Sequence, residues 1–512
     1  MKTHLAFLAF VVSLGGFLFG FDAGIISGVM EFFGPQFDLK EGQWGWVVSS
    51  PTFSATFAML IAGRLSDMIG RKPILLVIAF LYTLSAVASA YAASFEMMYI
   101  ARMVGGAAFG AALIIAPTYI AEIATAKSRG KLVSIQQLNI VLGFFAAFAS
   151  NRILQAMTKG EDPLMSDETV WRWMLGVEAL PAALYFIFML LVPESPRWLI
   201  SKGRDEQGRK VLNRLHGEEA GAAESVAIKE SIARELATEK GAFSELFSRG
   251  LRFIVFLGLV IGILQQSTGI NAIYFYANSI FEQTGIGTDA AFTSGVLLSS
   301  TSVVFTIVAM LLIDRMGRRP LLIVGIGGIA VSLLMCAWAF SQATYQLTAD
   351  DIATLDAPEL APLAEVTDEV FESDVAFKNK MKDLLGTTVY GKQEGAILQA
   401  AIDMPGVIAL AGIFGFIACF AFSLGPVMWV MLSELYPNRI RGLAIGTIGF
   451  VNSATSWVVQ QVFPWELSVL GNAASFLIFG LIAAAGFFLF LKILPETKGK
   501  SLEELEAELV KG

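Results

Sequence analysis

The chain has 512 residues, of which 55% are hydrophobic and 16% are charged. Soluble domains carry about 25% charged residues, so this composition excludes an ordinary soluble protein. The net charge of −8 gives no indication of a nucleic-acid partner. Cys336 and Cys419 lie in apolar stretches and are too few for a disulfide framework or a metal site. The two histidines, His4 and His216, lie outside the apolar segments, so a carboxylate would have to carry any proton that moves.

Apolar segments near the length that a bilayer requires, about 20 residues, recur along the chain. The first is interpreted as a retained span and not as a signal peptide, because its apolar run is too long and no A-x-A site follows it. The sequence therefore predicts an all-α polytopic protein of the lipid bilayer. Its twelve predicted transmembrane helices are 5–30, 44–63, 74–93, 98–121, 131–155, 173–192, 252–282, 290–313, 320–340, 405–433, 442–465 and 470–494.

Polar segments separate and follow these spans. Residues 195–250, after the sixth span, are rich in Arg, Lys and Glu, and the stretches 204–216 and 222–239 are typical of short amphipathic helices. Residues 341–404, after the ninth span, hold twelve acidic residues and four lysines, a local charge of −8 that equals the charge of the whole chain. The tail 501–511 is typical of another short helix.

Lys and Arg are concentrated in every second loop, and the opposite loops are poor in them. The positive-inside rule therefore predicts a multi-pass protein of the plasma (inner) membrane with both termini in the cytoplasm. The acidic segment 341–404 then lies outside, either as a small extracellular cap or as a solvated loop without a specific role. Besides the basic residues of 195–250, the cytoplasmic loops hold Arg64, Arg71, Lys72, Lys127, Arg129, Arg315, Arg318, Arg319, Arg439 and Arg441.

The chain repeats itself. GRLSDMIGRKP (63–73) is echoed by IDRMGRRP (313–320), IAEIATAKSRG (120–130) by LSELYPNRIRG (432–442), and VPESPR (192–197) by LPETKG (494–499). The repeats are 247 residues apart in the first pair of motifs and 312 in the second, which locates an insertion at 341–404. The predicted domains are an N-terminal six-helix bundle (1–194), a cytoplasmic linker (195–250), a C-terminal six-helix bundle (251–494) that carries the insertion, and a cytoplasmic C-terminal helix (495–512).

Acid and arginine recur together in the repeated cytoplasmic motifs. An acid near a helix N-terminus meets the positive end of the helix dipole and can pair with an arginine. Such pairs would break and form again if the two bundles part on this side, and the alternative is a set of solvated charges that only fix topology. The candidate pairs are Asp67 with Arg71, Glu122 with Arg129, Asp314 with Arg318, and Glu434 with Arg441.

These motifs, with QQSTGIN and PETKGKSLEELE, resemble the sugar porter family of the major facilitator superfamily, and the pattern is similar to the bacterial and plant sugar/proton symporters. The resemblance covers nearly the whole chain except 341–404. It implies a monomer of two pseudo-symmetric six-helix bundles that alternately expose a central site. Met68 stands where the family often has arginine, so the first-half gate lacks one expected partner.

Amide side chains mark a candidate substrate site. A sugar needs uncharged groups that both donate and accept hydrogen bonds, with a flat aromatic face, and LQQSTGINAIYFY (264–276) supplies such groups inside a span. Gly425 and Pro426 are expected to break a helix just before Trp429. The alternative is that the amides only join helices. The resemblance implies that sugar is contacted by Phe19, Gln137, Gln265, Gln266, Asn271, Gly425, Trp429 and Asn452.

Two departures from the xylose symporters bear on the substrate. Phe144 stands where they carry a further glutamine, and Ser453 stands where they carry a tryptophan. The ring of amides is thinner and one aromatic wall is missing. We therefore expect a hexose such as glucose or galactose in preference to xylose.

Asp22 is the single charge between His4 and Glu31, and it lies inside the first predicted span. An unpaired buried carboxylate costs at least a few kcal/mol, so it must find a cation or take a proton. Arg102, isolated at the start of the fourth span, is the candidate cation. The alternatives are a proton switch and a permanent structural ion pair. The resemblance favours the switch, because proton-coupled members carry an acid at this position and facilitators carry an asparagine. Glu178 in the sixth span is a second, weaker candidate carboxylate, either a proton relay or a plain interfacial group.

The sequence thus predicts a proton-coupled monosaccharide symporter that works by alternating access. Facilitated diffusion with an inert Asp22–Arg102 pair is the main alternative, and a membrane sensor that binds sugar without moving it is another. We expect no enzyme, because the spans hold no histidine cluster, nucleophile elbow or metal-ligand spacing. No cofactor is expected beyond the coupling proton.

Overall fold

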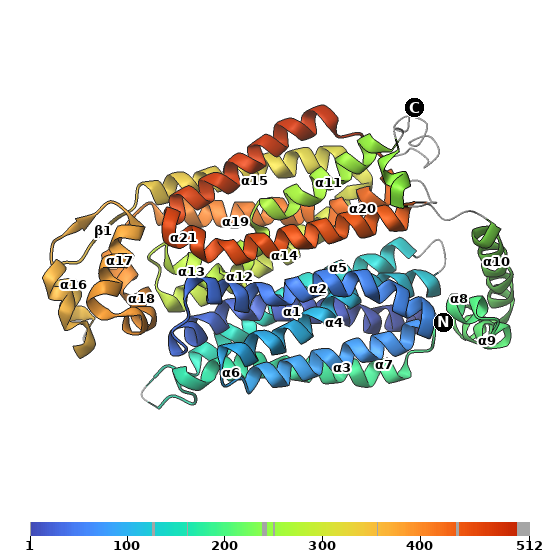
Figure 1. Cartoon of the computed structure of the whole chain (residues 1–512), viewed down its shortest axis with the longest axis horizontal. Helices are drawn as coiled ribbons and strands as arrows, with labels where there is room; N and C mark the ends of the chain where they lie inside the picture. Colours follow the sequence, from blue (N-terminus) through green and yellow to red (C-terminus); the bar gives the residue numbers. More distant parts are fainter. Residues whose placement is uncertain are drawn as a thin grey trace.

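The computed structural model describes residues 2–124, 129–160, 162–237, 243–248, 251–355, 357–436 and 440–498. Apolar helices run along the long axis of the molecule in two groups (Figure 1). The first group, the N-half, consists of α1 (Lys2–Gln36), α2 (Glu41–Ile69), α3 (Arg71–Ala90), α4 (Phe95–Ile123), α5 (Arg129–Ala156), α6 (Asp167–Val177) and α7 (Ala179–Leu191). The second, the C-half, consists of α11 (Arg252–Ser267), α12 (Ile270–Phe275), α13 (Ala277–Glu282), α14 (Thr288–Met316), α15 (Arg318–Ser341), α19 (Gly406–Phe422), α20 (Leu424–Leu435) and α21 (Arg441–Ile493).

Eleven helical segments within the described residues are long and apolar enough to cross a membrane. The last of them, α21, has 53 residues and would extend about 80 Å, far more than the roughly 30 Å of a hydrocarbon core. Gly471 interrupts it with φ 77° and ψ 175°, so α21 is two spans that meet at this kink. The prediction of a helical protein with twelve spans is confirmed, although the last two predicted spans form one helical run.

Two spans are broken where polar groups are needed. The span that starts with α11 stops at Thr268, and Gly269 takes a left-handed conformation, with φ 84°, before α12 begins. A side chain at 269 would also collide with the ring of Phe479, so only glycine fits. The break between α19 and α20 lies at Ser423, and Pro426 sits in the first turn of α20, where no N–H is missed. Gly425 and Pro426 therefore follow the break that they were expected to cause.

The insertion folds into a small unit with its own core. It comprises β1 (Thr344–Gln346), α16 (Ala349–Thr354), the 3-10 helix η2 (Pro358–Val366), β2 (Val370–Phe371), α17 (Asp374–Leu385), α18 (Thr387–Ala401) and β3 (Ile402–Asp403). The strands form an antiparallel sheet of order β2-β1-β3, in which Tyr345 pairs with Phe371 and Ile402. Tyr345 of β1 is buried in this core together with Leu363 and Phe377.

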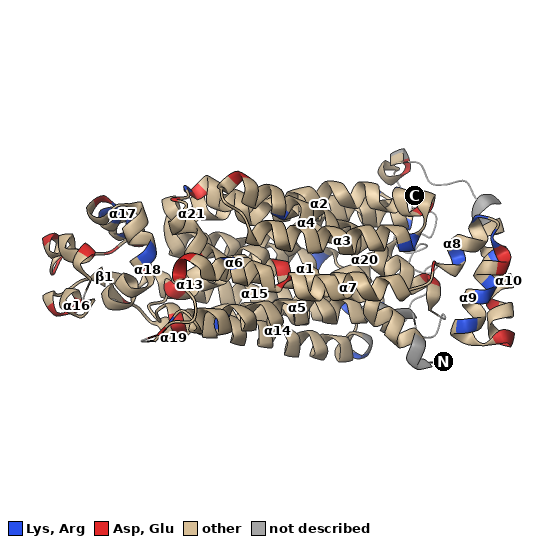
Figure 2. Ribbon diagram, turned by 90° about the horizontal axis from the view of Figure 1, so that it is seen from below, with Lys and Arg blue, Asp and Glu red and all other residues tan. Residues whose placement is uncertain are grey.

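The insertion and the polar linker lie at opposite ends of the molecule (Figures 1 and 2). The linker holds α8 (Pro196–Ser201), α9 (Asp205–His216), α10 (Glu218–Ala237) and the 3-10 helix η1 (Phe243–Phe247). Charged residues gather at these two ends, the insertion end and the linker end, and are sparse between them (Figure 2). Helices α9 and α10 coincide with the predicted stretches to within a few residues. The predicted tail helix 501–511 lies outside the described residues.

The halves touch at the insertion end. Among the described residues, hydrogen bonds between the halves join α2 to α21, α5 to α14, and Ser27 of α1 to the backbone N–H of Asn278. The insertion is fixed to the C-half by Asp374, whose carboxylate accepts bonds from the backbone and side-chain N–H groups of Asn472, both 2.8 Å. It also contacts the N-half, where Thr387 donates to Asp38 over 2.6 Å. The insertion therefore bridges the two halves at their closed end.

Candidate functional site

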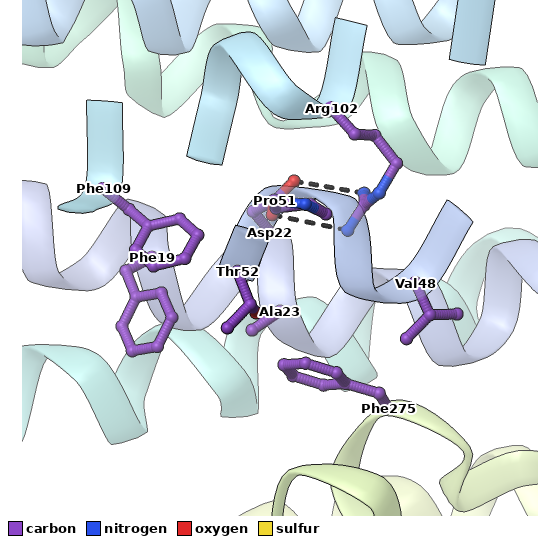
Figure 3. Close-up of a pocket in the computed structure, with 9 residues that line it drawn as sticks. All are labelled: Phe19, Asp22, Ala23, Val48, Pro51, Thr52, Arg102, Phe109 and Phe275. Carbon is purple, nitrogen blue, oxygen red and sulfur yellow. Dashed lines mark hydrogen bonds and ion pairs between the residues drawn. The ribbon is translucent and has the colours of Figure 1, made fainter. Parts of the chain in front are cut away.

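Asp22 and Arg102 form a buried ion pair between α1 and α4. The Arg102 Nη1 atom lies 3.2 Å from Asp22 Oδ1, and Nη2 lies 3.5 Å from Oδ2 (Figure 3). Their exposed fractions are 6% for Asp22 and 2% for Arg102. The third nitrogen of the guanidinium, Nε, donates to the backbone carbonyl of Val47 in α2 over 3.0 Å. The structure thus brings together two charges that each stand alone in apolar sequence.

A small pocket opens beside this pair. Its walls come from α1, α2 and α4 of the N-half and from Phe275 of α12 in the C-half (Figure 3). Its volume of about 10 Å³ is roughly the space of one water molecule, far too small for a sugar. Phe19 packs against Phe109 here, with ring centroids 4.7 Å apart. The predicted wall residue Phe19 therefore lines the pocket of the ion pair.

Glu178 is a third buried charge near the pair. It stands between α6 and α7, is 3% exposed, and interacts electrostatically with both Asp22 and Arg102. Tyr82 of α3 interacts with the same two acids and donates its hydroxyl hydrogen to the carbonyl of Gly15. The centre of the N-half is therefore a cluster of ionisable groups around one cation.

The predicted amides of the C-half form one network. Asn452 Nδ2 donates to Gln265 Oε1 and to the carbonyl of Gly262, each over 2.8 Å. Gln266 Nε2 donates to Gln265 Oε1 (3.2 Å) and Asn452 Oδ1 (3.3 Å), and its own Oε1 accepts from Asn271 Nδ2 (3.0 Å). Gln265 Nε2 reaches the carbonyl of Leu424 beside the break before α20 (2.9 Å). The break at Gly269 lets Asn271 join amides from the preceding turn.

Four predicted site residues lie outside this network, and one of them, Phe19, lines the pocket of the ion pair. Gln137 is on α5 in the N-half and is partly exposed, and no hydrogen bond within the described residues joins it to the amides. Trp429 on α20 is 41% exposed, and Gly425 lies one turn before it. The structure therefore groups four of the eight predicted sugar contacts in one network. The other four, Gln137, Trp429, Gly425 and Phe19, lie outside that network.

Two polar residues of this region escaped sequence reasoning. Ser456 Oγ accepts from Asn271 Nδ2 (2.6 Å) and from Gln460 Nε2 (2.7 Å). Gln460 is completely buried, and its Oε1 accepts from Thr52 of the N-half over 3.0 Å. Asn452, Ser456 and Gln460 stand four residues apart, which places them on one face of a helix. That spacing is the signal from which they could be found.

The repeated cytoplasmic motifs form matching clusters, one in each half. Arg71 bonds Glu122 (Nη2–Oε1 2.9 Å) and Asp67 (Nη1–Oδ1 2.9 Å), and Arg318 bonds Glu434 (2.8 Å). The expected pairing of Glu434 with Arg441 is not what the structure shows. Glu434 takes its cation from the start of α15, and Arg441 Nε donates to the nearby carbonyl of Tyr436. The side chains of Arg129 and Asp314 lie outside the described part of the chain.

Glutamates of the echoed VPESPR and LPETKG motifs complete these clusters. Glu194 accepts hydrogen bonds from the backbone N–H groups of Arg71 and Lys72 at the start of α3. Glu496 does the same for Arg318 and Arg319 at the start of α15. Each carboxylate meets the positive end of a helix dipole. The bonds described above join elements within one half.

Comparison with known proteins gives the family. The model of the "Sugar (and other) transporter" family matches residues 8–353 and 384–509, so the unmatched stretch falls inside the insertion. The chain is 32% identical to the arabinose-proton symporter of Bacillus subtilis (strain 168), over 97% of this chain and 93% of that protein. It is 30% identical to the D-xylose-proton symporter of Escherichia coli (strain K12), over 99% and 96%.

Solved structures agree with these relatives. The inward open conformation of the xylose transporter XylE from E. coli matches with a TM-score of 0.75 and 27% identity, over 99% of this chain and 100% of that chain. XylE bound to 6-bromo-6-deoxy-D-glucose matches with a TM-score of 0.72 and 28% identity over the same shares. The protein is a multi-pass membrane transporter and not an enzyme, and it belongs to the sugar porter family of the major facilitator superfamily.

Proposed function

We propose that this protein is a proton-coupled monosaccharide symporter that works by alternating access. The observation that carries the proposal is the buried Asp22–Arg102 pair, which faces a pocket closed on one side by Phe275 of the other half. Two of its relatives are named as proton symporters of pentoses. The proton is the only coupling species that the proposal requires, and Asp22 is its carrier.

The chemistry of the pair suits a switch. A buried carboxylate is stabilised by the guanidinium beside it, and a buried acid without that cation favours its neutral form. If Asp22 takes a proton, its attraction to Arg102 falls and the contact between α1 and α4 weakens. Arg102 keeps the Val47 carbonyl as a hydrogen-bond acceptor, so the cation is never left without a partner. Each turnover would then exchange a guanidinium partner for a proton.

The amide network supplies the sugar contacts. Each amide offers both a donor and an acceptor, which matches the hydroxyl groups of a ring without placing a charge in the membrane. Phe144 packs against Tyr274 of α12 with ring centroids 4.5 Å apart, where an amide would have offered another polar contact. This apolar contact supports a hexose as the substrate class, because the ring of polar contacts is smaller than in the xylose symporters.

The proposal fixes an orientation and a conformational state. The basic linker end lies in the cytoplasm with both termini, and the insertion lies outside the plasma (inner) membrane. Because the described contacts between the halves lie at the insertion end, the structure then corresponds to a state closed outward. The cytoplasmic clusters around Arg71 and Arg318 are intact within each half and would meet the opposite half only when the inner side closes. A monomer suffices for this cycle.

The test is uptake by purified protein in proteoliposomes with an imposed pH gradient and a panel of glucose, galactose, xylose and arabinose. A gradient of one pH unit drives about tenfold accumulation per proton. Asp22→Asn should abolish accumulation and leave sugar exchange intact. Glu466→Gln is the control. It neutralises a different buried acid, which lies on α21, and should leave accumulation unchanged. Unchanged accumulation in Asp22→Asn would contradict proton coupling through this residue. If the natural protein moved sugar only down its gradient, it would be a uniporter. If the natural protein moved no sugar, it would be a sensor.

A further inference from the structure

Hydrogen bonds and one helix connect the ion pair of the N-half to the amide network of the C-half. The connection runs through α2, which carries one contact to Arg102 and, five residues later, one contact to Gln460. This inference rests on the proposed function, since it concerns how binding of a proton and binding of a sugar influence each other. It concerns residues for which neither the sequence motifs nor the ion pair gives a role.

The first step is a backbone carbonyl that a proline deprives of its usual helical N–H donor. Pro51 lies inside α2, and a proline has no N–H to donate to the carbonyl four residues earlier. That carbonyl belongs to Val47, and it accepts from Arg102 Nε over 3.0 Å and, more weakly, from Ser50 Oγ over 3.5 Å. With any other residue at 51, the helix would supply its own donor and compete with the arginine. Pro51 therefore makes α2 an anchor for Arg102.

The second step crosses between the halves. Thr52, the next residue, donates to Gln460 Oε1 over 3.0 Å, and both side chains are buried. Gln460 Nε2 continues to Ser456 Oγ (2.7 Å), which also accepts from Asn271 Nδ2 (2.6 Å). Asn271 in turn bonds Gln266 in the amide network. A continuous chain of hydrogen bonds thus runs from Thr52 to the predicted sugar contacts.

Three other bonds between α2 and α21 do not lead into the network. Thr56 and Ser453 share a hydrogen bond of 2.7 Å, and Ser49 donates to Gln461 over 2.8 Å. Gln461 continues only to the carbonyl of Gly42, back on α2, among the described hydrogen bonds. The same helix pair therefore offers one contact that connects to the amides and three that hold the halves together without doing so.

We propose that Pro51, Thr52 and Gln460 are positioning residues that couple the Asp22–Arg102 pair to the amide network when the insertion end is closed. Protonation of Asp22 shifts the guanidinium toward Val47, and α2 transmits the shift to Thr52 and Gln460. The ionisable groups that face this cation are Asp22 of α1 and Glu178 between α6 and α7, with Tyr82 of α3 interacting with both acids. When Asp22 is neutral, the Val47 carbonyl is the hydrogen-bond acceptor that Arg102 keeps, and Glu178 is the remaining acid near it.

The test compares Thr52→Val with Thr56→Val. Each removes one hydroxyl from α2 and one buried bond to α21, so the loss of contact between the halves is matched. Thr56→Val also removes the bond that its hydroxyl donates to the carbonyl of Thr52 over 2.8 Å, so it is the more disruptive of the two changes. The measured quantity is the ratio of the sugar KM at alkaline and at acid outside pH, which reports the proton–sugar coupling. We expect a ratio of about fivefold or more in the natural protein and in Thr56→Val. Thr52→Val should bring the ratio to within about twofold of unity.

Two further variants separate positioning from structure. Thr52→Ser keeps the hydroxyl and should restore the ratio. Pro51→Ala adds the missing N–H and should move the pH of half-maximal uptake to lower values, because Arg102 loses an acceptor when Asp22 is neutral. Pro117→Ala in α4 is its control, since no described side chain donates to the carbonyl of Leu113 that this proline leaves free.

Equal effects of Thr52→Val and Thr56→Val on the KM ratio would overturn the inference. An unchanged pH of half-maximal uptake in Pro51→Ala would also overturn it. A KM that does not depend on pH in the natural protein would instead contradict symport itself. The two failures are therefore distinguishable.

Discussion

The two halves share their cytoplasmic chemistry and differ in the middle of the membrane. At the linker end, Arg71 with Glu122 in one half matches Arg318 with Glu434 in the other. Deeper inside, the N-half holds the buried Asp22–Arg102 ion pair, and the C-half holds a network of uncharged amides. The repeated part of the sequence thus builds the same turn twice, and the parts that do not repeat carry different chemistry.

This difference follows from what each ligand requires. A proton needs an ionisable group whose charged form is tolerable in a dry site, which demands a fixed cation nearby. A sugar needs neutral donors and acceptors, and a charge among them would cost desolvation energy with each release. Separating the two kinds of group between halves lets relative motion of the halves link the two binding events.

The largest effect is expected for Asn452→Ala. Asn452 is 6% exposed, makes three hydrogen bonds within the amide network, and is expected to contact sugar. Its loss should raise the sugar KM on the order of 30- to 100-fold, the equivalent of about 2–3 kcal/mol. Exchange kinetics in proteoliposomes measure this change.

The matched variant in the other half is Asn139→Ala. Asn139 is 3% exposed and donates to Ser13 over 2.6 Å, away from the amides. It should lower stability and change the KM by less than about threefold. Equal KM effects of the two variants would contradict the assignment of sugar recognition to the C-half.

A second difference between the halves is the insertion, which is fixed at the kink of α21. Gly471 has φ 77°, and a side chain there would collide with the carboxylate of Asp374. Gly471→Ala should lower the free energy of unfolding by about 2–3 kcal/mol, from backbone strain and from loss of the Asp374 contacts. Thermal unfolding of the purified protein in detergent measures this loss. Gly446→Ala is the control, because a side chain at that helical position meets nothing within 4 Å and should be neutral or slightly stabilising.

A smaller and equal effect is expected for Glu194→Gln and Glu496→Gln. Each carboxylate caps the start of a helix at the same place in its half. Either substitution should cost about 0.5–1 kcal/mol of stability, and the double variant should show the sum because the sites do not touch. Strongly unequal losses of stability in the two single variants would show that the two halves share these motifs in sequence but not in energetic role.

Hydropathy and spacing predicted most of the fold, because lipid imposes length and apolarity on every span. They missed two of the internal breaks, at Ser423 and Gly471, by a few residues. Ser423 carries no strong signal for a break, and Gly471 resembles many other glycines of the chain. The insertion was located by comparing the spacing of the repeats. Its sheet was not predicted, since β1, β2 and β3 have only two or three residues each.

The site was predictable where residues are chemically out of place. Asp22, Arg102 and the amides of 265–271 are polar groups in apolar sequence, and the structure brings each set together. The partner of Glu434 was mistaken because the regular spacing to Arg441 suggested a local pair, while Arg318 approaches from a distant helix. The acceptor of Arg102 at Val47 is a backbone carbonyl, which the residue type at 47 does not reveal. The only sequence signal for it is Pro51, four residues later.

The smallest effect on stability is expected for a solvent-exposed carboxylate of the insertion. Asp351 accepts bonds from the hydroxyl and the backbone N–H of Thr348 at the start of α16, and these bonds lower the pKa of its carboxyl. The cap therefore contributes fully above the pKa of an ordinary aspartate, about 3.9, and is lost as the pH falls through the lower, folded value. Asp351 is almost wholly exposed, so solvent screens the interaction. Hydrogen exchange of Ala349–Thr354, corrected for intrinsic rates, should quicken by less than about threefold at acid pH, and Asp351→Asn should remove that pH dependence. A large acid effect that survives Asp351→Asn would show that this end also contains a buried titrating group linked to the halves.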